Sequence, residues 1–414
     1  MSSSPLVLFT NAALLDGTGD GAVEGHLLVE GDLIREVSAE PIRSESARVI
    51  ALRGRTLMPG LIDCHVHVIA SLANLGQNAM LPDAIVAYRA AKLMREMLGR
   101  GFTTVRDVGG ATQALVQALD EDLIEGPRLV ICGKALSQTG GHADFRGRYD
   151  HRDAGYQTLR LGAMGRICDG VEAVRAAARD EIRQGATFIK IMANGGVASP
   201  TDPIAFLGFS ADELRAVVEE ARNAQTYVAA HLYTDEAIRR AVEAGVRSVE
   251  HANLITPETA RYMTEMGAIA CPTLVTYDAL KNEGASLGFP PDSVAKIDDV
   301  RLKGFESLEI MREAGTTMAY GTDLLGAMHR HQSEEFVLRG RVLPPIEVIR
   351  STTVHAATLL RQEDRIGILA PGACADLIAV DGDPLADLSL LTRQGQHLPV
   401  IMKSGRFFKN EINA

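Results

Sequence analysis

The chain has 414 residues, of which 46% are hydrophobic, and its formal net charge is −11 at pH 7. No apolar run approaches the roughly 18 residues of a membrane-spanning helix, and the first ten residues lack the basic segment of a signal peptide. Acidic and basic residues are interspersed, which argues against nucleic acid as a partner. We therefore expect a soluble, cytoplasmic protein with neither nucleic acid nor membrane as a partner.

The two ends of the chain share one pattern, short apolar segments broken by Gly and Asp without helical periodicity. This pattern is typical of short β-strands. We expect residues 1–57 and 366–414 to combine into one small β-sandwich domain.

Between these ends, residues 58–365 alternate helical and strand patterns. Repeated strand, helix, strand units with parallel returns predict an α/β fold, a (β/α)8 TIM-like barrel. A doubly wound open sheet is the alternative, but no Gly-x-Gly-x-x-Gly follows a predicted strand. The predicted helix N-caps are Asp169 for a helix at 171–184, Ser210 with Glu213 as a capping box, Thr234 for a helix to Ala244, and Thr256 before Pro257.

Cysteine occurs five times, an odd number without a Cys-x-x-Cys pair. Most of these residues stand in apolar runs, so we expect buried thiols. Cys64 directly precedes His65 on a predicted strand, so strand alternation should point its side chain away from the side to which His65 points.

Five apolar segments of the central region contain or end at residues that can bind a divalent metal. In a barrel, parallel strands present their carboxyl ends at one face, where active sites are built. We therefore expect these side chains to converge on one site. The candidate ligands are His65, His67, Lys190, His231, His251 and Asp323.

His65 and His67 lie two residues apart on a predicted strand, so both side chains leave the same face. The same spacing also occurs at packed and surface positions. Lys190 lies inside an apolar strand, and burying an ammonium group costs on the order of several kcal/mol unless it is compensated. Two explanations stay open: a salt bridge to a carboxylate such as Asp323, or a neutral amine that adds carbon dioxide and becomes a carbamate bridging two cations.

The other histidines give weaker signals. Taken singly, His231 or His251 could be a hydrogen-bonded core histidine. His142 follows two glycines in a loop and either faces the substrate or is an ordinary polar loop residue. His329 and His331 follow Asp323 closely, and we expect solvated loop positions for them rather than the pocket mouth.

At these residues the chain resembles the amidohydrolase superfamily, and the similarity runs nearly end to end. Within the superfamily, residues 188–196 (FIKIMANGG) and 231–233 (HLY) are similar to the Xaa-Pro dipeptidase (prolidase-like) and N-acyl amino acid hydrolase branch, which includes ochratoxin-degrading amidohydrolases. The motifs that carry the wider resemblance are 59–67 (PGLIDCHVH), 101–107 (GFTTVRD) and 371–378 (PGACADLI).

The resemblance implies a site for two divalent metal ions. It places His65, His67 and Asp323 at one ion, His231 and His251 at the other, and Lys190, modified by carbon dioxide to N6-carboxylysine, between them. Zinc suits imidazole and oxygen ligands, although manganese or cobalt can substitute.

The mechanism that follows from the resemblance is hydrolysis of the amide bond of an N-acyl amino acid or dipeptide by a hydroxide that bridges the metals. Asp323 would shuttle the proton to the leaving amine, and Tyr233 or His142 would donate to the developing oxyanion. Ochratoxin A is one possible substrate. Proteins of this branch commonly assemble into homo-oligomers, often octamers.

Other activities of the superfamily stay open. Hydrolysis of cyclic amides or lactones and deamination are alternatives, although deaminases generally use one metal and lack the strand lysine, so Lys190 counts against deamination. A non-catalytic scaffold is disfavoured because every ligand position is filled. Arginines at 146, 148, 152 and 160 in the loop 137–167 could bind a substrate carboxylate, but solvated positions are the expectation for most of them.

Overall fold

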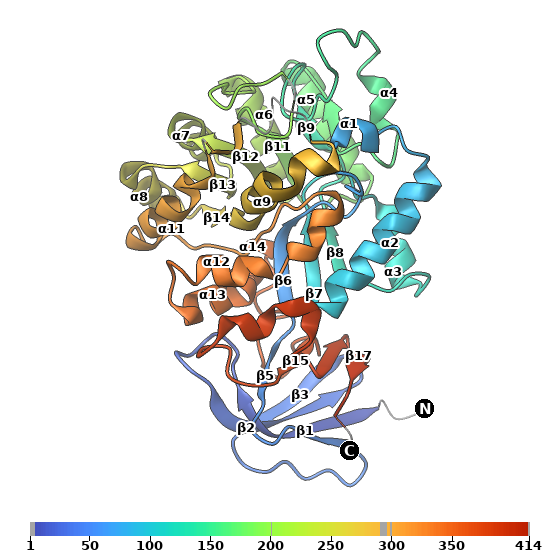
Figure 1. The fold of residues 1–414 in the computed structure, drawn as a ribbon, viewed down its shortest axis with the longest axis vertical. Helices are drawn as coiled ribbons and strands as arrows, with labels where there is room; N and C mark the ends of the chain where they lie inside the picture. The colour runs from blue at the N-terminus through green and yellow to red at the C-terminus, as the bar shows by residue number, and fades with distance from the viewer. Residues whose placement is uncertain (1–4, 200, 290–295, 299, 413–414) are drawn as a thin grey trace. The chain divides into compact units, whose positions relative to one another are not determined.

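The structure is a computed structural model that describes residues 5–199, 201–289, 296–298 and 300–412 (Figure 1). Its chain divides into two compact units. One unit comprises residues 1–63, 95–105 and 336–414, and the other comprises residues 64–94 and 106–335. The predicted domain limits, 1–57, 58–365 and 366–414, stay predictions.

The first unit contains a sheet built from both ends of the chain. Its strands follow the order β17-β16-β15-β5-β1-β2-β3, and β4 pairs with β1. β15 pairs antiparallel with β5, so that Ile378 lies opposite Met58. The two ends therefore share one sheet, as predicted, while its sandwich arrangement stays a prediction. The strands are β1 (Leu6–Leu14), β2 (Val23–Glu30), β3 (Leu33–Ser38), β4 (Arg48–Ala51), β5 (Thr56–Pro59), β15 (Leu377–Val380), β16 (Val400–Lys403) and β17 (Arg406–Asn410).

Alternating side chains of these strands form an apolar core. Val7 and Phe9 of β1 are buried together with Leu27 and Val29 of β2 and Leu377 of β15. Because successive strand residues point to opposite faces, this alternation fixes which face of each strand packs inward.

The barrel strands occur in two sheets, with the orders β6-β7-β8 and β10-β9-β11-β12-β13-β14. Strand pairs β11-β12, β12-β13 and β13-β14 are all parallel. The strands are β6 (Leu61–Val66), β7 (Phe102–Asp107), β8 (Arg128–Ile131), β9 (Ala135–Ser137), β10 (Gly165–Ile167), β11 (Ile189–Met192), β12 (Val228–Thr234), β13 (Ser248–Leu254) and β14 (Ile269–Cys271).

Backbone hydrogen bonds close these strands into a ring. The amide of Thr187, just before β11, donates to the carbonyl of Ile131 in β8 over 2.9 Å. On the other side, the segment 317–320 pairs with β14, and its Tyr320 carbonyl accepts from the Cys64 amide of β6 over 2.7 Å. In the part of the chain that the structure describes, this ring has eight strand positions, which are β6, β7, β8, β11, β12, β13, β14 and the segment 317–320. The short strands β9 and β10 pair beside β11 and are not counted among the eight. The barrel prediction is confirmed, and the open-sheet alternative is wrong.

Helices of the second unit surround its strands, as the green to orange ribbons in Figure 1 show. Among the described residues, no helix is long and apolar enough to cross a membrane. The α-helices of the chain are α1 (Leu75–Asn78), α2 (Asp83–Gly99), α3 (Gln113–Asp120), α4 (Gly155–Thr158), α5 (Val171–Arg183), α6 (Ala211–Asn223), α7 (Asp235–Ala244), α8 (Pro257–Glu265), α9 (Leu274–Ala279), α11 (Lys303–Glu313), α12 (Glu334–Arg339), α13 (Pro345–Thr352) and α14 (Val354–Leu360). Shorter turns are η1 (Leu280–Gly284), η2 (Ala285–Leu287), η3 (Gly326–His331), η4 (Leu388–Leu391) and η5 (Arg393–Gly395).

Three predicted helix starts are confirmed. Ser210 and Glu213 form the reciprocal capping box of α6. Thr234 caps α7, and Thr256 caps α8, whose first residue is Pro257. These caps fix the residues at which α6, α7 and α8 begin.

The predicted cap of α5 is wrong. Gly170, with a φ of 83°, occupies the N-cap position, and no side chain caps this helix. The Asp169 carboxylate instead accepts from the amide and the hydroxyl of Thr139, over 2.9 and 2.6 Å. The side chain that could cap the helix is thus committed to the loop that leads towards His142.

All five cysteines are buried and reduced, as predicted. Burial raises the pKa of the Cys132 thiol well above its ordinary value and that of Cys168 to about 12. These thiols therefore stay protonated and unreactive near neutral pH.

Candidate active site

One pocket of the second unit gathers every candidate ligand. His65 and His67 come from the end of β6, Lys190 from β11, His231 from β12, His251 from β13, and Asp323 from the segment after residues 317–320. Tyr233 and His142 also line the pocket, whereas Cys64 is not among its described lining residues. The pocket encloses about 40 Å³.

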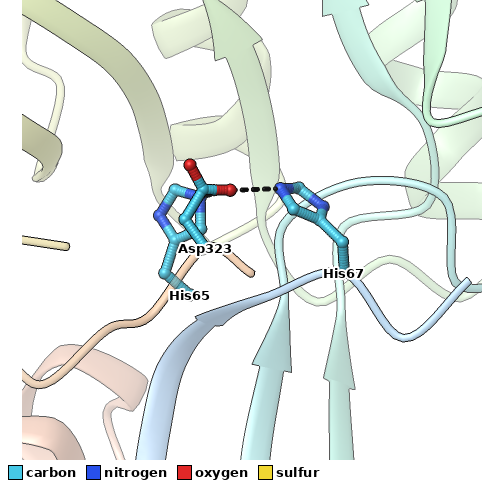
Figure 2. A group of neighbouring side chains, drawn as sticks. All are labelled: His65, His67 and Asp323. Atoms are coloured by element: carbon cyan, nitrogen blue, oxygen red, sulfur yellow. Dashed lines mark ion pairs between the residues drawn. The ribbon is translucent and has the colours of Figure 1, made fainter. Parts of the chain in front are cut away.

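The first cluster in the pocket consists of His65, His67 and Asp323 (Figure 2). The Asp323 Oδ1 atom lies 3.4 Å from His65 Nε2 and 3.1 Å from His67 Nε2. One donor atom from each residue falls within 4.8 Å of the others. Two imidazole nitrogens and a carboxylate oxygen facing one point are a donor set that suits zinc.

Within the first cluster, electrostatic interactions oppose the effect of burial on the pKa values of Asp323 and His65. Burial alone would raise the pKa of Asp323, but the His65 and His67 imidazoles hold that pKa well below its ordinary value. Burial opposes the charged form of His65, yet Asp323 and Glu250 raise its pKa above the ordinary value. The carboxylate is therefore ionised and available as a ligand or a proton acceptor.

The second cluster is a pair of histidines, His231 and His251. His231 Nδ1 lies 2.9 Å from His251 Nε2, and the ring centroids are 4.7 Å apart. Burial lowers the pKa of both imidazoles well below the ordinary value; neighbouring histidines add to this effect, His142 and His251 for His231, and His65 for His251. Neutral imidazole is the form of histidine that binds a metal.

Each imidazole of the first cluster has one nitrogen that faces the pocket and a second nitrogen that contacts a polar group outside it. His65 Nδ1 lies 2.7 Å from the Glu250 carboxylate, and His67 Nδ1 lies 3.4 Å from the Gly109 carbonyl. Metal-binding histidines almost always engage a carboxylate or carbonyl in this way, because that contact fixes which nitrogen faces the ion.

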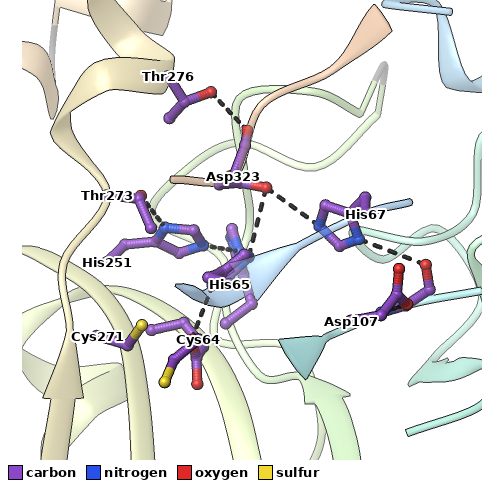
Figure 3. Close-up of polar contacts among 12 residues, drawn as sticks. Cys64, His65, His67, Asp107, His251, Cys271, Thr273, Thr276 and Asp323 are labelled. Carbon is purple, nitrogen blue, oxygen red and sulfur yellow. Dashed lines mark hydrogen bonds and ion pairs between the residues drawn. The ribbon is translucent and has the colours of Figure 1, made fainter. Parts of the chain in front are cut away.

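The second cluster repeats this arrangement. His251 Nδ1 lies 2.8 Å from the Thr273 hydroxyl, as Figure 3 shows. His231 Nε2 lies 3.3 Å from the Gly195 carbonyl, so its Nδ1 atom faces the pocket. Each of the four imidazoles therefore has one nitrogen that faces the pocket and one that contacts a polar group outside it. This arrangement suits metal binding.

Glu250 is a residue that the sequence analysis missed. Its side chain is fully buried and accepts from Arg106 Nη2 over 2.8 and 3.0 Å and from the Ser248 hydroxyl over 2.5 Å. Burial opposes ionisation, but Arg106 and His65 hold the pKa of Glu250 well below its ordinary value. Glu250, His65 and Cys271 also form a compact donor group, but the Glu250 carboxylate is already neutralised by Arg106. We therefore assign Glu250 to orienting His65.

Lys190 is 1% exposed and lies among the histidines of the pocket. Burial lowers the pKa of its amine, and Arg106 adds to this effect, while Glu250 and Asp323 oppose it. A lowered pKa favours the neutral amine, the form that can react with carbon dioxide.

Backbone strain coincides with two of the candidate ligand positions. His251 and Asp323 have positive φ angles of 69° and 51°, and Ala252 has 58°. Such angles are uncommon for residues other than glycine and cost on the order of 1 to 3 kcal/mol each. Hydrogen bonds hold Asp323 in this conformation: its amide donates to the His65 carbonyl over 2.8 Å, and its carbonyl accepts from the Thr276 hydroxyl over 2.7 Å.

Tyr233 stands beside the second cluster. Its ring stacks on His251 with centroids 5.1 Å apart and meets the edge of His231 at 4.8 Å. The Tyr277 hydroxyl donates to the Tyr233 hydroxyl over 3.0 Å. A Tyr233 hydroxyl that accepts from Tyr277 can donate its own proton to another acceptor.

The structure brings His142 into the pocket, but not His329 or His331. His142 stacks on His231 with ring centroids 4.0 Å apart. The prediction that His329 is solvated is wrong. Its side chain is buried, and its Nε2 atom lies 3.3 Å from the Ala70 carbonyl. His331 pairs with Glu283 at the surface.

The loop arginines pair with nearby carboxylates. Arg146 contacts Asp144 at 2.6 Å, and Arg152 contacts Asp150 at 2.5 Å. Arg160 contacts Asp83, and neither it nor Arg146, Arg148 or Arg152 is among the described residues that line the pocket.

Comparison with known proteins decides the family. The sequence pattern of the amidohydrolase family matches residues 56–406. The chain belongs to the amidohydrolase family. Its relatives include an ochratoxinase from Aspergillus niger, 30% identical over 96% of this chain and 85% of that protein.

Solved structures of amidohydrolases match this chain over nearly its whole length. One amidohydrolase is 52% identical, with a TM-score of 0.97, and the match covers 99% of this chain and 100% of the other. A prolidase in complex with N-methylphosphonate-L-proline is 49% identical, with a TM-score of 0.96 and coverage of 98% and 100%. The amidohydrolase described here thus falls in the prolidase and ochratoxinase branch and is a hydrolase that acts on amide bonds.

Proposed function

We propose that this amidohydrolase is a binuclear metal enzyme that removes the C-terminal amino acid from N-acyl amino acids or dipeptides, in the manner of a prolidase or an ochratoxinase. The observation that carries the proposal is the shared orientation of four imidazoles. Each has one nitrogen that faces the pocket and another that contacts a carboxylate, a carbonyl or a hydroxyl outside it. The relatives supply the substrate class: an ochratoxinase, and a prolidase with a proline phosphonate.

His65, His67 and Asp323 would hold one ion, and His231 and His251 the other. Two bound divalent ions supply a polarised substrate carbonyl and a water of lowered pKa. Imidazole and carboxylate donors favour zinc.

Lys190 would bridge the two clusters as N6-carboxylysine. Its neutral Nζ atom attacks the carbon of carbon dioxide, a nitrogen–carbon bond forms, and one proton is released to give an anionic carbamate. The burial that lowers the pKa of Lys190 supports this reaction because only the neutral amine has the required lone pair.

Three side chains of the pocket would act on the substrate. Asp323 accepts the proton of the attacking water and passes it to the leaving amine, because its carboxylate is ionised at the centre of the pocket. Tyr233 donates its hydroxyl proton to the carbonyl oxygen as negative charge develops there, and His142 is a second donor to the same region.

Further parts of the proposal rest on the resemblance and on the composition. Membership of this branch supports a homo-oligomer, with an octamer as the expected form. The net charge of −11 supports a small-molecule substrate over nucleic acid, and we propose a cytoplasmic location.

The decisive experiment measures amino acid release by mass spectrometry from a substrate panel. The panel contains N-acyl amino acids and dipeptides with C-terminal proline, aromatic or basic residues, together with ochratoxin A. We expect release that stops when the metal is chelated and returns with zinc, and a metal content near two ions per chain. No release by the fully metallated protein would overturn the proposal in favour of lactone or cyclic amide hydrolysis, and a content of one ion per chain would point to deamination.

A further inference from the structure

The loop after β11 holds a buried aspartate that neither the sequence nor the proposed metal site accounts for. Asp202 is 1% exposed, although it lies in an irregular segment. Its Oδ2 atom accepts from the Gly196 amide over 2.9 Å and lies 3.3 Å from His142 Nδ1. Its Oδ1 atom is buried without a hydrogen-bond partner among the described residues.

A half-satisfied buried carboxylate is costly and therefore needs an explanation. Removing a charged oxygen from water without replacing its hydrogen bonds costs more than the roughly 1 to 3 kcal/mol of a neutral group. An asparagine could accept from the Gly196 amide at lower cost. Only a carboxylate, however, places a negative charge beside the His142 ring.

The surroundings of His142 leave its ring little freedom. The Ser199 hydroxyl lies 2.7 Å from Nδ1, on the same edge as Asp202. A Cβ atom placed on Gly196 would lie 1.9 Å from His142 Cε1, so only glycine permits this approach. His231 stacks on the ring with centroids 4.0 Å apart.

A lysine secures the loop that carries these contacts. Lys296 Nζ donates to the carbonyls of Gly196, Ser199 and Asp202 over 2.9, 3.1 and 3.1 Å. Three carbonyls of one short loop bound to a single ammonium fix the loop backbone, and with it the position of the Asp202 carboxylate.

We propose that Asp202 is a positioning residue that acts through His142. It holds the Nδ1 edge of the ring away from the pocket, so that Nε2 is presented to an oxygen of the substrate. The partners of one imidazole nitrogen determine the orientation of the other.

This inference rests on the proposed function, and the substrate offers two such oxygens. The carbonyl oxygen gains negative charge during the reaction, whereas the carboxylate oxygen of the C-terminal residue is charged throughout. Both are acceptors for the same imidazole edge. Interactions that strengthen in the transition state affect kcat, and those present from the start affect KM.

The test compares kcat and KM of the zinc-loaded wild type, Asp202→Asn, His142→Gln and the double variant. Asp144→Asn is the matched control, because Asp144 is also buried and also accepts from a glycine amide, that of Gly140 over 3.0 Å, but pairs with Arg146 outside the pocket. We expect Asp202→Asn to lower kcat/KM roughly 10- to 100-fold, less than removal of an oxyanion donor itself, while the control stays within about twofold of wild type.

Non-additivity separates positioning from a merely structural role. If Asp202 acts through His142, Asp202→Asn has little further effect in the His142→Gln background. Substrates with a free C-terminal carboxylate and with a C-terminal amide distinguish the two oxygens: a loss in kcat for both assigns the carbonyl, and a rise in KM for the acid alone assigns the carboxylate. Multiplicative losses, or an Asp202→Asn enzyme equal to wild type, would overturn the inference.

A binding measurement decides the inference even where turnover is absent. Calorimetry with a phosphonate analogue of an Xaa-Pro dipeptide reports the affinity for a charged tetrahedral group. Weaker binding by Asp202→Asn than by Asp144→Asn supports the role of Asp202, and equal binding contradicts it. Failure of the wild type to hydrolyse any amide would overturn the proposed function alone.

Discussion

The central pocket and a second cavity of the same unit each contain a buried lysine, and the groups that surround the two amines differ. The second cavity, which we call the peripheral cavity, measures about 610 Å³ against about 40 Å³ for the central pocket. Its polar lining residues include Lys134, Arg160, Arg166, Asp180 and Glu181. Volume alone would therefore select the wrong site.

In the peripheral cavity, oxygen atoms stabilise the buried ammonium. Lys134 Nζ donates to the carbonyls of Arg160 and Ala163 over 2.8 and 2.5 Å, and the Glu181 carboxylate favours its charge. In the central pocket, Lys190 lies among five histidines, and the carboxylates that favour its charge, Glu250 and Asp323, also interact with His65. A buried lysine that has hydrogen-bond acceptors is typical of a structural role, whereas a buried lysine among candidate metal ligands is a candidate for a chemical role.

The largest expected effect is that of Lys190→Ala. Without the bridging carbamate we expect loss of metal and a fall of activity to background, with partial recovery when a short carboxylic acid such as propionate is added. Metal content and turnover measure the result. Lys134→Ala is the matched control, because it also removes a buried lysine, and it should retain both metal and activity without any response to propionate. Full metal and activity in Lys190→Ala would remove the lysine from the site.

Asp323→Asn should have the next largest effect. The amide keeps the shape of the side chain but cannot accept a proton, so kcat should fall about 10²- to 10⁴-fold while much of the substrate affinity remains. Steady-state kinetics at matched metal content measure this loss. Asp180→Asn, which alters a carboxylate of the peripheral cavity paired with Arg166, is the control. An unchanged rate in Asp323→Asn would exclude the proton shuttle.

Tyr233→Phe tests the donor to the carbonyl oxygen. Loss of one such donor typically lowers kcat by about 10²- to 10³-fold, with KM affected less. Tyr277→Phe should cost less, because Tyr277 contacts the hydroxyl of Tyr233. If both phenylalanine variants lose the same small amount, Tyr233 contributes packing and not a proton.

Glu250→Gln tests the residue behind His65. Partners of metal-binding histidines typically contribute about 10- to 100-fold to metal affinity, so zinc should be lost at lower chelator concentration. Glu181→Gln is a matched control, because Glu181 is buried and pairs with Arg166 and the Lys134 amide in the peripheral cavity. Equal zinc retention by the two variants would contradict an orienting role for Glu250.

The residues that could be predicted from the sequence are those that interrupt an apolar strand at its end. His65, His231 and His251 each interrupt an apolar strand, and active sites of barrels are built at the face where the carboxyl ends of the strands lie. The composite sheet could be predicted for a related reason, because the same strand pattern stands at both ends of the chain.

The residues that support the ligands could not be predicted in this way. Glu250 lies one residue before His251 on β13, and its carboxylate contacts both His65 of β6 and Arg106 of β7. A charged residue inside an apolar strand was a visible signal, but its partner is distant in sequence. Asp202 lies 60 residues from His142 in an irregular loop, where no periodicity indicates a contact.

The smallest expected effect concerns stability and the peripheral lysine. Burial lowers the pKa of Lys134 to about 8 from an ordinary value of 10.5. Between these pH values the unfolded chain binds more protons than the folded protein, so the free energy of unfolding should rise with pH, by on the order of 3 kcal/mol at most. Below pH 8 both states are protonated and the full cost remains. Denaturant unfolding at pH 7.5, 8.5 and 9.5 measures this rise, and Lys134→Met should lack it. If the free energy of unfolding changes with pH in the same way in the two proteins, the carbonyls fully offset the cost of burying the Lys134 ammonium.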